Sequence, residues 1–387
     1  MQDAATAAAR APDEPVRDAV EEILRAGPPG AHLSVGTPRT RLHHCAGLAQ
    51  AFGDDGPDAR PLRPDAAHDL GSVTKVAATT CCLAALVSAG EVSLDTPASR
   101  YLPLPCRDAT LDDLLTHRAG LWEWWPTYLQ ARGAEEALAL VGRLPLRYRP
   151  GSGRHYSDLG FMALGQVVQE VCGASLVDAL TELVTEPLSL TGLAYGGPVT
   201  GQDPVASSAG DWVERRMVAT GRPYPVPVDD TAFTGWRARV LVGEVNDGNA
   251  FHSFGGVAGH AGLFGDAASL HGLGRALLQS ARGLGTWPSL PAFWAPSQDD
   301  GQLRGFQRWS DRVRDCAVAA IGHTGFPGTG FAVLPAHDAT VVLATNRLHV
   351  PPDGDGPAPF APMWRSALHA AHTALHLAGD TAAPQDR

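Results

Sequence analysis

The placement of strand-like segments near both ends of the chain is the feature that most constrains its fold. The segments AHLSVG, RLHHCAG and LAQAFG, which begin at residue 31, carry turn residues between them and are typical of strands in a meander. Near the other end, RDCAVAAIGHTGF (314–326), GTGFAVLP (328–335) and ATVVLATNR (339–347) alternate or run apolar, with β-branched and aromatic residues. Because both ends contribute strands, we predict an α/β domain closed by both termini.

The middle of the chain carries helical patterns instead. The clearest are LDDLLTH (111–117), EEALALVGRL (135–144), LGFMALGQVVQEVCG (159–173) and SLVDALTELVTEPL (175–188). Helices are also predicted at 15–26, 268–281 and 362–378. We therefore predict an α/β domain from residues 15–75 plus 260–378, a mostly helical inserted domain over 76–259, and disordered ends at 1–14 and 379–387.

Charge and hydropathy exclude two classes of partner. The 387 residues include 30 Lys and Arg against 41 Asp and Glu, a net charge of −11, which is the wrong sign for nucleic acid or an anionic membrane surface. The longest apolar run, Val76 to Ala89, falls short of the roughly 20 residues of a membrane helix and has the length of a buried core helix. We predict neither a nucleic-acid nor a membrane partner.

The N-terminus and the cysteines bear on the compartment. Met1 to Pro15 is interrupted by acidic residues and is followed by no hydrophobic region of the kind that a secretory signal has. The six cysteines are scattered and none falls in a CxxC pair, which indicates reduced, mostly buried thiols. We expect a cytoplasmic protein.

A single lysine, Lys75, stands among 30 basic residues, so the other 29 are arginines. Arginine does not lose its proton inside a protein, whereas a desolvated lysine can. Ser72 lies three residues before Lys75, which puts both side chains on one face of a helix. A serine hydroxyl becomes a strong nucleophile only beside a base. The pair is therefore a candidate catalytic centre, although an ordinary helix start with a solvated lysine would also explain it.

Two further motifs follow in order, HYSD (155–158) and GHTG (322–325). Together with Ser72 and Lys75 they resemble the serine β-lactamase and penicillin-binding-protein superfamily, whose motifs are S-x-x-K, S-D-N and K-T-G. The second motif has a tyrosine in place of the serine of S-D-N. In this it resembles the class C β-lactamase branch and its relatives, among them family VIII carboxylesterases, D-aminopeptidases and acyl-transferring esterases. The resemblance covers residues 15 to 378 and extends to the segments LLTHRAGL (114–121), GGVAGHAGLF (255–264) and LATNRLH (343–349).

The resemblance implies a β-lactamase/transpeptidase-like fold of the α/β (α+β) class, an antiparallel sheet flanked by helices with an inserted all-helical domain. It implies that Ser72 is the acylated nucleophile, that Lys75 takes or shares its proton, and that Tyr156 is the general base. It places His323 on the opposite wall. It further implies that the backbone N–H groups of Ser72 and Phe326 form the oxyanion hole.

The chain departs from the family pattern at two positions. Asp158 stands where the family often has asparagine, and an ionised aspartate cannot donate a hydrogen bond and tends to keep Lys75 charged. His323 stands where β-lactamases have lysine, and a neutral imidazole holds a substrate carboxylate less well. The first change shifts the base role towards Tyr156, and both changes disfavour β-lactam recognition and favour a small neutral ester or amide. We expect Asp158, Thr324 and Gly325 to bind this substrate, and we expect weak turnover of β-lactams.

A tryptophan cluster in the predicted insertion is a second candidate for substrate binding. Trp122 and Trp124, together with Trp125, could line a pocket for an apolar acyl or leaving group, or could be buried core.

Several other patterns favour a structural role. His369, His372 and His376 have a zinc-like spacing but lack the glutamate of a zincin, so helix packing is preferred to a metal site. His43-His44, His117 and His260 are predicted to pack or to bond turns, with a supporting role at the site open for the last two. Glu214-Arg215-Arg216 fits a solvated face, and the glycines of 255–262 let the backbone pass close to the pocket.

The sequence therefore predicts a serine hydrolase that cleaves a small ester or amide through an acyl-enzyme on Ser72, with no metal or organic cofactor. Three alternatives stay open. An acyltransferase would replace water by an alcohol or amine, a D-Ala-type peptidase or weak β-lactamase would act on a related amide, and a non-catalytic binding protein would use the fold alone. The oligomeric state is open as well.

Overall fold

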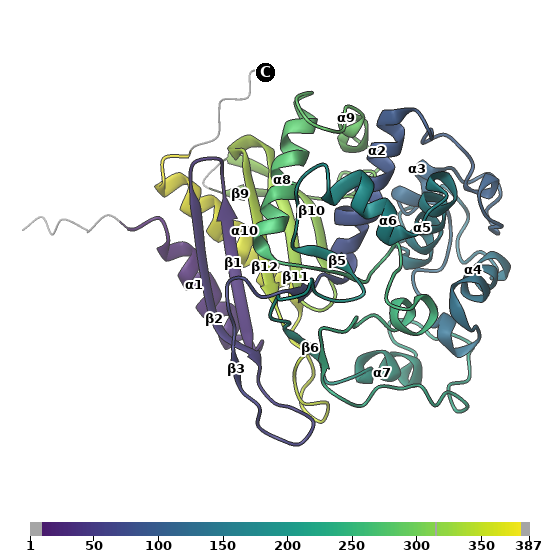
Figure 1. The fold of residues 1–387 in the computed structure, drawn as a ribbon, viewed down its shortest axis with the longest axis horizontal. Helices are drawn as coiled ribbons and strands as arrows, with labels where there is room; N and C mark the ends of the chain where they lie inside the picture. The colour runs from purple at the N-terminus through teal and green to yellow at the C-terminus, as the bar shows by residue number, and fades with distance from the viewer. Residues whose placement is uncertain (1–9, 314–315, 381–387) are drawn as a thin grey trace, which may run out of the picture.

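A seven-stranded antiparallel sheet forms one half of the molecule (Figure 1). The computed structural model describes residues 10–313 and 316–380, without the side chains of 311–318. In the sheet order β3-β2-β1-β12-β11-β10-β9, the strands near the two chain ends meet at the centre, where Ala31 pairs with Thr345 and Val35 with Val341. The strands are β1 (Gly30–Gly36), β2 (Arg41–Gln50), β3 (Arg60–Pro61), β9 (Gln307–Val313), β10 (Cys316–Gly325), β11 (Thr329–Leu334) and β12 (Ala339–Thr345). The predicted antiparallel sheet built from both ends of the chain is confirmed.

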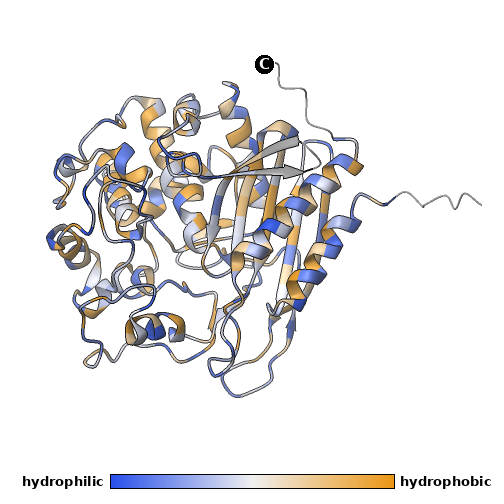
Figure 2. Ribbon diagram, turned by 180° about the vertical axis from the view of Figure 1, so that it is seen from behind, coloured by the Kyte–Doolittle hydropathy of each residue, from blue (hydrophilic) through white to orange (hydrophobic). Residues whose placement is uncertain are grey.

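Helices cover both faces of this sheet. Helices α1 (Glu14–Arg25) and α10 (Phe360–Leu377) lie side by side across one face, with hydrophilic residues along their outer sides (Figure 2). Helix α8 (Ala267–Ala281) covers the other face. Successive side chains of a strand point to opposite faces, so in β12 Val341 and Leu343 join the core under α1 and α10, while Val342 joins the core under α8. A strand covered on both faces is largely apolar, and β12 is buried along its whole length, with Thr340 and Thr345 as its polar residues.

The second half of the molecule is largely helical (Figure 1). It contains α2 (Cys81–Ala89), α3 (Leu111–Leu115), α4 (Gly133–Arg143), α5 (Asp158–Cys172), α6 (Leu176–Leu180) and α7 (Trp212–Thr220), and α9 (Leu290–Trp294) lies near α8. Helix α5 packs against the glycine-rich loop at 255–262 with almost no space between the backbones. A Cβ atom on Gly259 would lie 2.2 Å from the carbonyl oxygen of Phe161. The close backbone approach expected of these glycines is thus present at Gly259.

The insertion departs from the all-helical expectation after residue 190. Short strands occur there, β5 (Leu193–Tyr195), β6 (Ala206–Ser208) and β7 (Leu241–Val242), and β5 joins β4 (His68–Asp69) and β8 (Leu263–Gly265) in a small sheet. The segment at 196–250 is otherwise mostly loop, with the one helix α7. Its turn-rich sequence has no helical period, which is why the prediction of an all-helical insertion is wrong here.

Other differences are local. LAQAFG is not a third strand, because its first residues extend β2, and β9 was not predicted because its sequence QRWSDRV is polar. Helix α1 begins at Glu14, inside the predicted disordered end, and residues 1–9 and 381–387 of the two predicted tails lie outside the described residues.

The helix that carries Ser72 is broken into three pieces. A 3-10 turn (Gly71–Val73) leads into a π-helical turn (Lys75–Thr80) and then into α2. The whole run, Gly71–Ala89, is long and apolar enough to cross a membrane, but 72% of its most apolar window is buried inside the protein. The prediction of a buried core helix is confirmed. The five cysteines whose side chains are described, Cys45, Cys81, Cys82, Cys106 and Cys172, are unpaired, as expected, and the side chain of Cys316 lies outside the description.

Candidate active site

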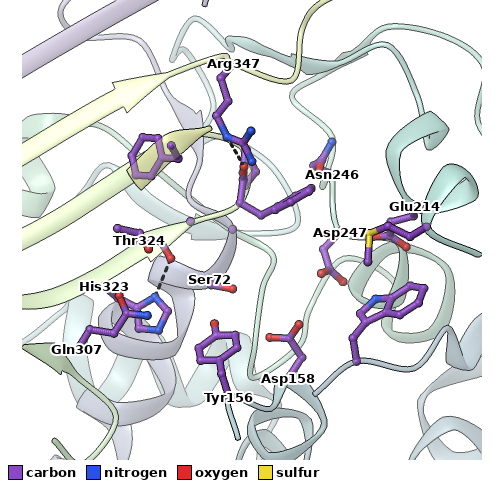
Figure 3. Close-up of a pocket in the computed structure, with 17 residues that line it drawn as sticks. Ser72, Tyr156, Asp158, Glu214, Asn246, Asp247, Gln307, His323, Thr324 and Arg347 are labelled. Atoms are coloured by element: carbon purple, nitrogen blue, oxygen red, sulfur yellow. Dashed lines mark hydrogen bonds between the residues drawn. The ribbon is translucent and has the colours of Figure 1, made fainter. Parts of the chain in front are cut away.

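A cavity of about 350 Å³ lies between the end of strand β10 and the helical half of the molecule (Figure 3). The sequence motifs meet there although they are far apart in the chain. Its lining includes most of the predicted site residues, Ser72, Trp124, Tyr156, Asp158, His323, Thr324, Gly325 and Phe326. The buried side chain of Lys75 lies beside them, in contact with Ser72.

The turn that presents Ser72 is held by a buried carboxylate. Asp69 accepts hydrogen bonds from the backbone N–H of Gly71 at 2.8 Å and from that of Asn246 at 2.6 Å. Burial raises the pKa of Asp69 to about 6, although these hydrogen bonds favour its charged form. Gly71 has a φ of +49°, which a side chain would disfavour. Asp69 thus joins the serine turn to the loop on the far side of the cavity.

Lys75 makes three short polar contacts with its ammonium group. Its Nζ donates to Ser72 Oγ at 2.8 Å and to the carbonyl oxygen of His260 at 3.0 Å, and lies 2.6 Å from Asp158 Oδ1. Burial by itself lowers the pKa of Lys75, but the charges of Asp158 and Tyr156 outweigh it, so this pKa is raised. Since an ammonium has three hydrogens, all are engaged, and Lys75 is a charged donor in this state.

Tyr156 stands beside Ser72, with its hydroxyl directed toward the serine (Figure 3), and its ring centre lies 5.1 Å from Lys75 Nζ. Its ring lies between two histidines, at centroid distances of 4.6 Å from His117 and 5.7 Å from His323. Burial raises the pKa of Tyr156, the Lys75 charge lowers it and the Asp158 charge raises it again, and the net result is a raised pKa. The phenolate is therefore the minor form at neutral pH.

His323 on strand β10 is a neutral acceptor. Its Nδ1 lies 2.7 Å from the carbonyl oxygen of Thr324, so the proton sits on Nδ1 and Nε2 is free to accept. Burial and the Lys75 charge lower the pKa of His323 to about 3. Its Nε2 is buried and has no hydrogen-bond partner among the described residues. The expectation of a neutral imidazole agrees with this geometry.

Strand β10 comes very close to the serine turn through glycine. A Cβ atom on Gly325 would lie 2.2 Å from the carbonyl oxygen of Leu70, and one on Gly71 would lie 3.2 Å from the backbone nitrogen of Phe326. Thr329 on β11 also donates to the carbonyl oxygen of Leu70 at 2.9 Å. The two N–H groups predicted to form an oxyanion hole, those of Ser72 and Phe326, are thereby brought to the same edge of the cavity.

Two histidines that were expected to be structural contact the site. The Nδ1 atom of His117 accepts a hydrogen bond from the N–H of Ser157 at 3.0 Å, beside Tyr156. His260 bonds to Asp247 through Nε2 at 2.9 Å and to Lys75 through its carbonyl oxygen. Both support the arrangement without facing the cavity, which matches the supporting role left open for them.

Two expectations about the cavity walls are corrected. Trp124 lines the cavity but Trp122 does not, because its indole N–H donates to the carbonyl oxygen of Pro145 at 2.9 Å and its ring packs edge-on against Trp125. Glu214, predicted on a solvated face, also lines the cavity, where the Tyr128 hydroxyl donates to it at 2.8 Å.

Three further residues, Asn246, Asp247 and Arg347, line the cavity and were not predicted from the sequence. Asn246 and Asp247 come from a loop without periodicity, so no local signal marked them. Arg347 lay within the segment LATNRLH, which carried part of the resemblance and could have drawn attention to it.

No metal centre is evident in the described part of the chain, where no three His, Cys, Asp or Glu side chains are grouped to hold an ion. His372 on α10 lies 3.2 Å from the ring of His337, a contact that fits the packing role predicted for it.

Comparisons with known proteins add four findings. A family model described as Beta-lactamase matches residues 16–361. An N-acetylmuramyl-L-alanine amidase of Bacillus subtilis (strain 168) is 29% identical over 365 residues, covering 86% of this chain and 80% of the amidase. Among solved structures, a D-amino acid amidase from Ochrobactrum anthropi SV3, in complex with D-phenylalanine, has a TM-score of 0.67 at 18% identity, covering 95% of this chain and 99% of its own. A class C β-lactamase from Rhodobacter sphaeroides has a TM-score of 0.64 at 18% identity over 94% and 99%.

Proposed function

The chain belongs to the Beta-lactamase family and is a serine hydrolase of that family, and on this premise we propose that it cleaves a small ester or amide through an acyl-enzyme on Ser72. One observation carries the assignment of Ser72. Its Oγ lies 2.8 Å from the Nζ of the sole lysine, and the hydroxyl of Tyr156 is directed toward it (Figure 3). A nucleophile in reach of both a fixed cation and an ionisable phenol meets the geometric requirement for covalent catalysis.

In the first half-reaction, Ser72 Oγ attacks the carbonyl carbon and its proton passes to the Tyr156 phenolate. The carbonyl oxygen becomes an oxyanion, which the N–H groups of Ser72 and Phe326 stabilise. When the intermediate collapses, the bond to the leaving group breaks and Tyr156 returns the proton to that group. In the second half-reaction, water gives a proton to Tyr156, attacks the acyl carbon and releases the acid, and Ser72 recovers its proton.

Lys75 is assigned the role of fixed cation, not of base. A base must have a free lone pair, whereas Lys75 is paired with Asp158 and has a raised pKa. Its charge lies 5.1 Å from the centre of the Tyr156 ring, where it favours the phenolate. Asp158 keeps Lys75 charged, so the departure from asparagine transfers the base role to Tyr156.

The substrate is proposed to lack the carboxylate that a lysine would bind in the H-T-G position. His323 is neutral there, because burial lowers its pKa to about 3, and it offers an acceptor instead of a positive charge. The names of two relatives, both amidases, favour an amide. The tyrosine of the HYSD motif resembles that of the family VIII carboxylesterase-like branch, and this resemblance favours an ester substrate.

Intact-protein mass spectrometry tests the proposal. The protein is exposed briefly to p-nitrophenyl esters and p-nitroanilides of short acids and to several β-lactams, beside Ser72→Ala and the exposed-serine control Ser152→Ala. We expect an added mass equal to the acyl group in the wild type and in Ser152→Ala but not in Ser72→Ala. An equal adduct in Ser72→Ala, or efficient hydrolysis of β-lactams, would contradict the proposal.

A further inference from the structure

One wall of the cavity carries three carboxyl groups. Asp158 begins helix α5, Glu214 lies in α7, and Asp247 lies in the loop that precedes residues 249–253. Figure 3 shows Glu214 and Asp247 close together on the side of the cavity away from strand β10, with Asp158 between them and Tyr156. We call Glu214 and Asp247 the carboxyl pair. Its members come from segments 33 positions apart and meet only through the fold.

Of the three carboxyl groups on this wall, Asp158 alone is paired with a lysine. Lys75 neutralises Asp158, at 2.6 Å. The carboxyl pair is bonded mainly to neutral groups. Glu214 accepts from the Tyr128 hydroxyl at 2.8 Å and from the N–H of Gly248 at 2.7 Å. Asp247 accepts from the N–H of Ala250 at 2.8 Å and contacts His260 at 2.9 Å.

The arginines in this region are committed elsewhere. Arg237 is paired with Asp211, and its Nε lies 2.9 Å from that carboxylate. Arg347 lies across the cavity, where it donates to the carbonyl oxygens of Phe326 at 3.1 Å and Ala358 at 2.9 Å (Figure 3). Arg215 and Arg216 are exposed. The carboxyl pair therefore faces the cavity without an arginine partner in the described part of the chain.

The two members of the carboxyl pair have pKa values that shift in opposite directions. Burial raises the pKa of Glu214 to about 8, and the charge of Asp247 adds to this shift. Burial also disfavours ionisation of Asp247, but the adjacent His260 ring outweighs it and lowers the pKa of Asp247 overall. One member is thus charged and the other holds a proton, as expected of two carboxyl groups that share a site.

Two further observations point to a ligand in this space. The cavity of about 350 Å³ is lined by the carboxyl pair and by Ser72, so a molecule held by the pair shares one space with the nucleophile. On the opposite wall, Nε2 of His323 is buried, lacks a partner among the described residues and is free to accept a hydrogen bond. Acceptors thus face the cavity from both sides, a pattern that complements a ligand rich in N–H donors.

We propose that the substrate carries an ammonium group close to its scissile carbonyl and that Glu214 and Asp247 bind this group. This inference rests on the proposed function of Ser72 and specifies its substrate class as amides or esters of amino acids with a free amine. An ammonium has three donors and no acceptor, so it can bond to both carboxyl groups at once. Its positive charge is also attracted by the ionised member of the pair.

Pairs of p-nitroanilides that differ only in the charged group test the proposal. In alanine p-nitroanilide, taken as both enantiomers, the ammonium of the acyl group replaces one methyl of isobutyryl p-nitroanilide. In β-alanine p-nitroanilide it replaces the terminal methyl of butyryl p-nitroanilide. We expect the wild type to favour at least one amine over its uncharged partner by about 10-fold or more in kcat/KM, the worth of one hydrogen bond to a charged group.

Variants of the pair locate the recognition. Glu214→Gln and Asp247→Asn keep the size of each side chain, and each is expected to reduce the amine preference by about 10-fold. Glu186→Gln, which removes an exposed carboxylate of the helical half, serves as the matched control and should keep the wild-type preference. The ratio of the two substrates is the readout, so a general loss of activity does not imitate the result.

A binding measurement separates this inference from the proposed function. Calorimetry with Ser72→Ala compares alaninamide with isobutyramide, and β-alaninamide with butyramide, without any reaction. Preferential binding of an amine without turnover by the wild type would support the carboxyl pair as its site and contradict the role of Ser72. Turnover of uncharged and amine substrates at equal rates would support Ser72 and overturn the inference. An amine preference that survives in both variants would also overturn it.

Discussion

The two walls of the cavity are built by different means. The sheet wall, residues 323–326, is the end of strand β10, which pairs with β11 as far as Gly325 and with β9 as far as Gly322, and glycine lets it approach the serine turn. The wall of the carboxyl pair consists of a short helix and loops whose carboxyl groups are held by single side-chain contacts, such as Tyr128 to Glu214. A paired strand fixes atoms closely, whereas loops tolerate change. We infer that the sheet wall serves the reaction and the carboxyl pair selects the substrate.

Lys75 joins Ser72 to Asp158, and changing it is expected to have the largest effect. Lys75→Arg keeps the positive charge but puts a larger planar group into a fully buried position. In the wild type, the ammonium at this position contacts Ser72 and Asp158. We expect kcat/KM to fall by about 10³-fold or more for charged and uncharged substrates alike. Steady-state kinetics with both kinds of anilide measure this, and circular dichroism checks that the variant is folded. Retention of a tenth of the activity would contradict the role of Lys75.

Tyr156 gives a prediction with a pH dependence. Tyr156→Phe removes the proposed base and is expected to lower kcat/KM by about 10²–10³-fold. In the wild type the phenolate is the active form, and the pKa of Tyr156 is raised above its usual value of about 10. The uncharged anilides should therefore be cleaved faster as pH rises from 6 to 9, without a plateau in that range. A plateau below pH 8 that Tyr156→Phe leaves in place would assign the base to another group.

Gly325 tests whether the sheet wall requires its close approach. A Cβ atom there would lie 2.2 Å from the carbonyl oxygen of Leu70 and 2.3 Å from Thr329 Oγ1, so Gly325→Ala must displace the strand end from the serine turn. We expect a loss of about 10²-fold in kcat for every substrate, comparable to the loss of one oxyanion donor, and destabilisation by about 1–3 kcal/mol. Gly153→Ala, whose Cβ atom has only the tip of His155 nearby at 3.5 Å, is the control. Equal kinetics in the two variants would separate the strand end from catalysis.

The same contrast explains what the sequence could predict. The central strands, the main helices and Ser72, Lys75, Tyr156 and His323 were found because each belongs to a short motif or a regular apolar period. Glu214 was assigned to a solvated face because it stands next to two arginines. Arg215 and Arg216 are indeed exposed, and α7 has no fully buried residue, but Glu214 itself lines the cavity. Asp247 stands in a loop, where contacts with His260 and with the N–H of Ala250 hold its carboxylate. Side chains that reach the cavity only through tertiary contacts have no local sequence pattern that predicts their position.

The smallest effect is expected from Glu214 on stability, and its sign distinguishes a substrate-binding group from a structural one. Burial raises the pKa of Glu214 to about 8, so between its unfolded pKa of about 4.3 and pH 8 the unfolded chain ionises at this position while the folded protein keeps the proton. Folding stability contributed by the protonated group is therefore lost as pH rises through this window. Glu214→Gln cannot ionise and should gain stability relative to the wild type between pH 5 and pH 8, by about 1 kcal/mol or more.

Urea unfolding at both pH values measures the difference, and Glu186→Gln should show much less change. A carboxyl group retained for stability would instead make Glu214→Gln the less stable protein at pH 8. The predicted gain means that the wild type keeps a destabilising acid beside its nucleophile, as expected of a group retained for binding a cation.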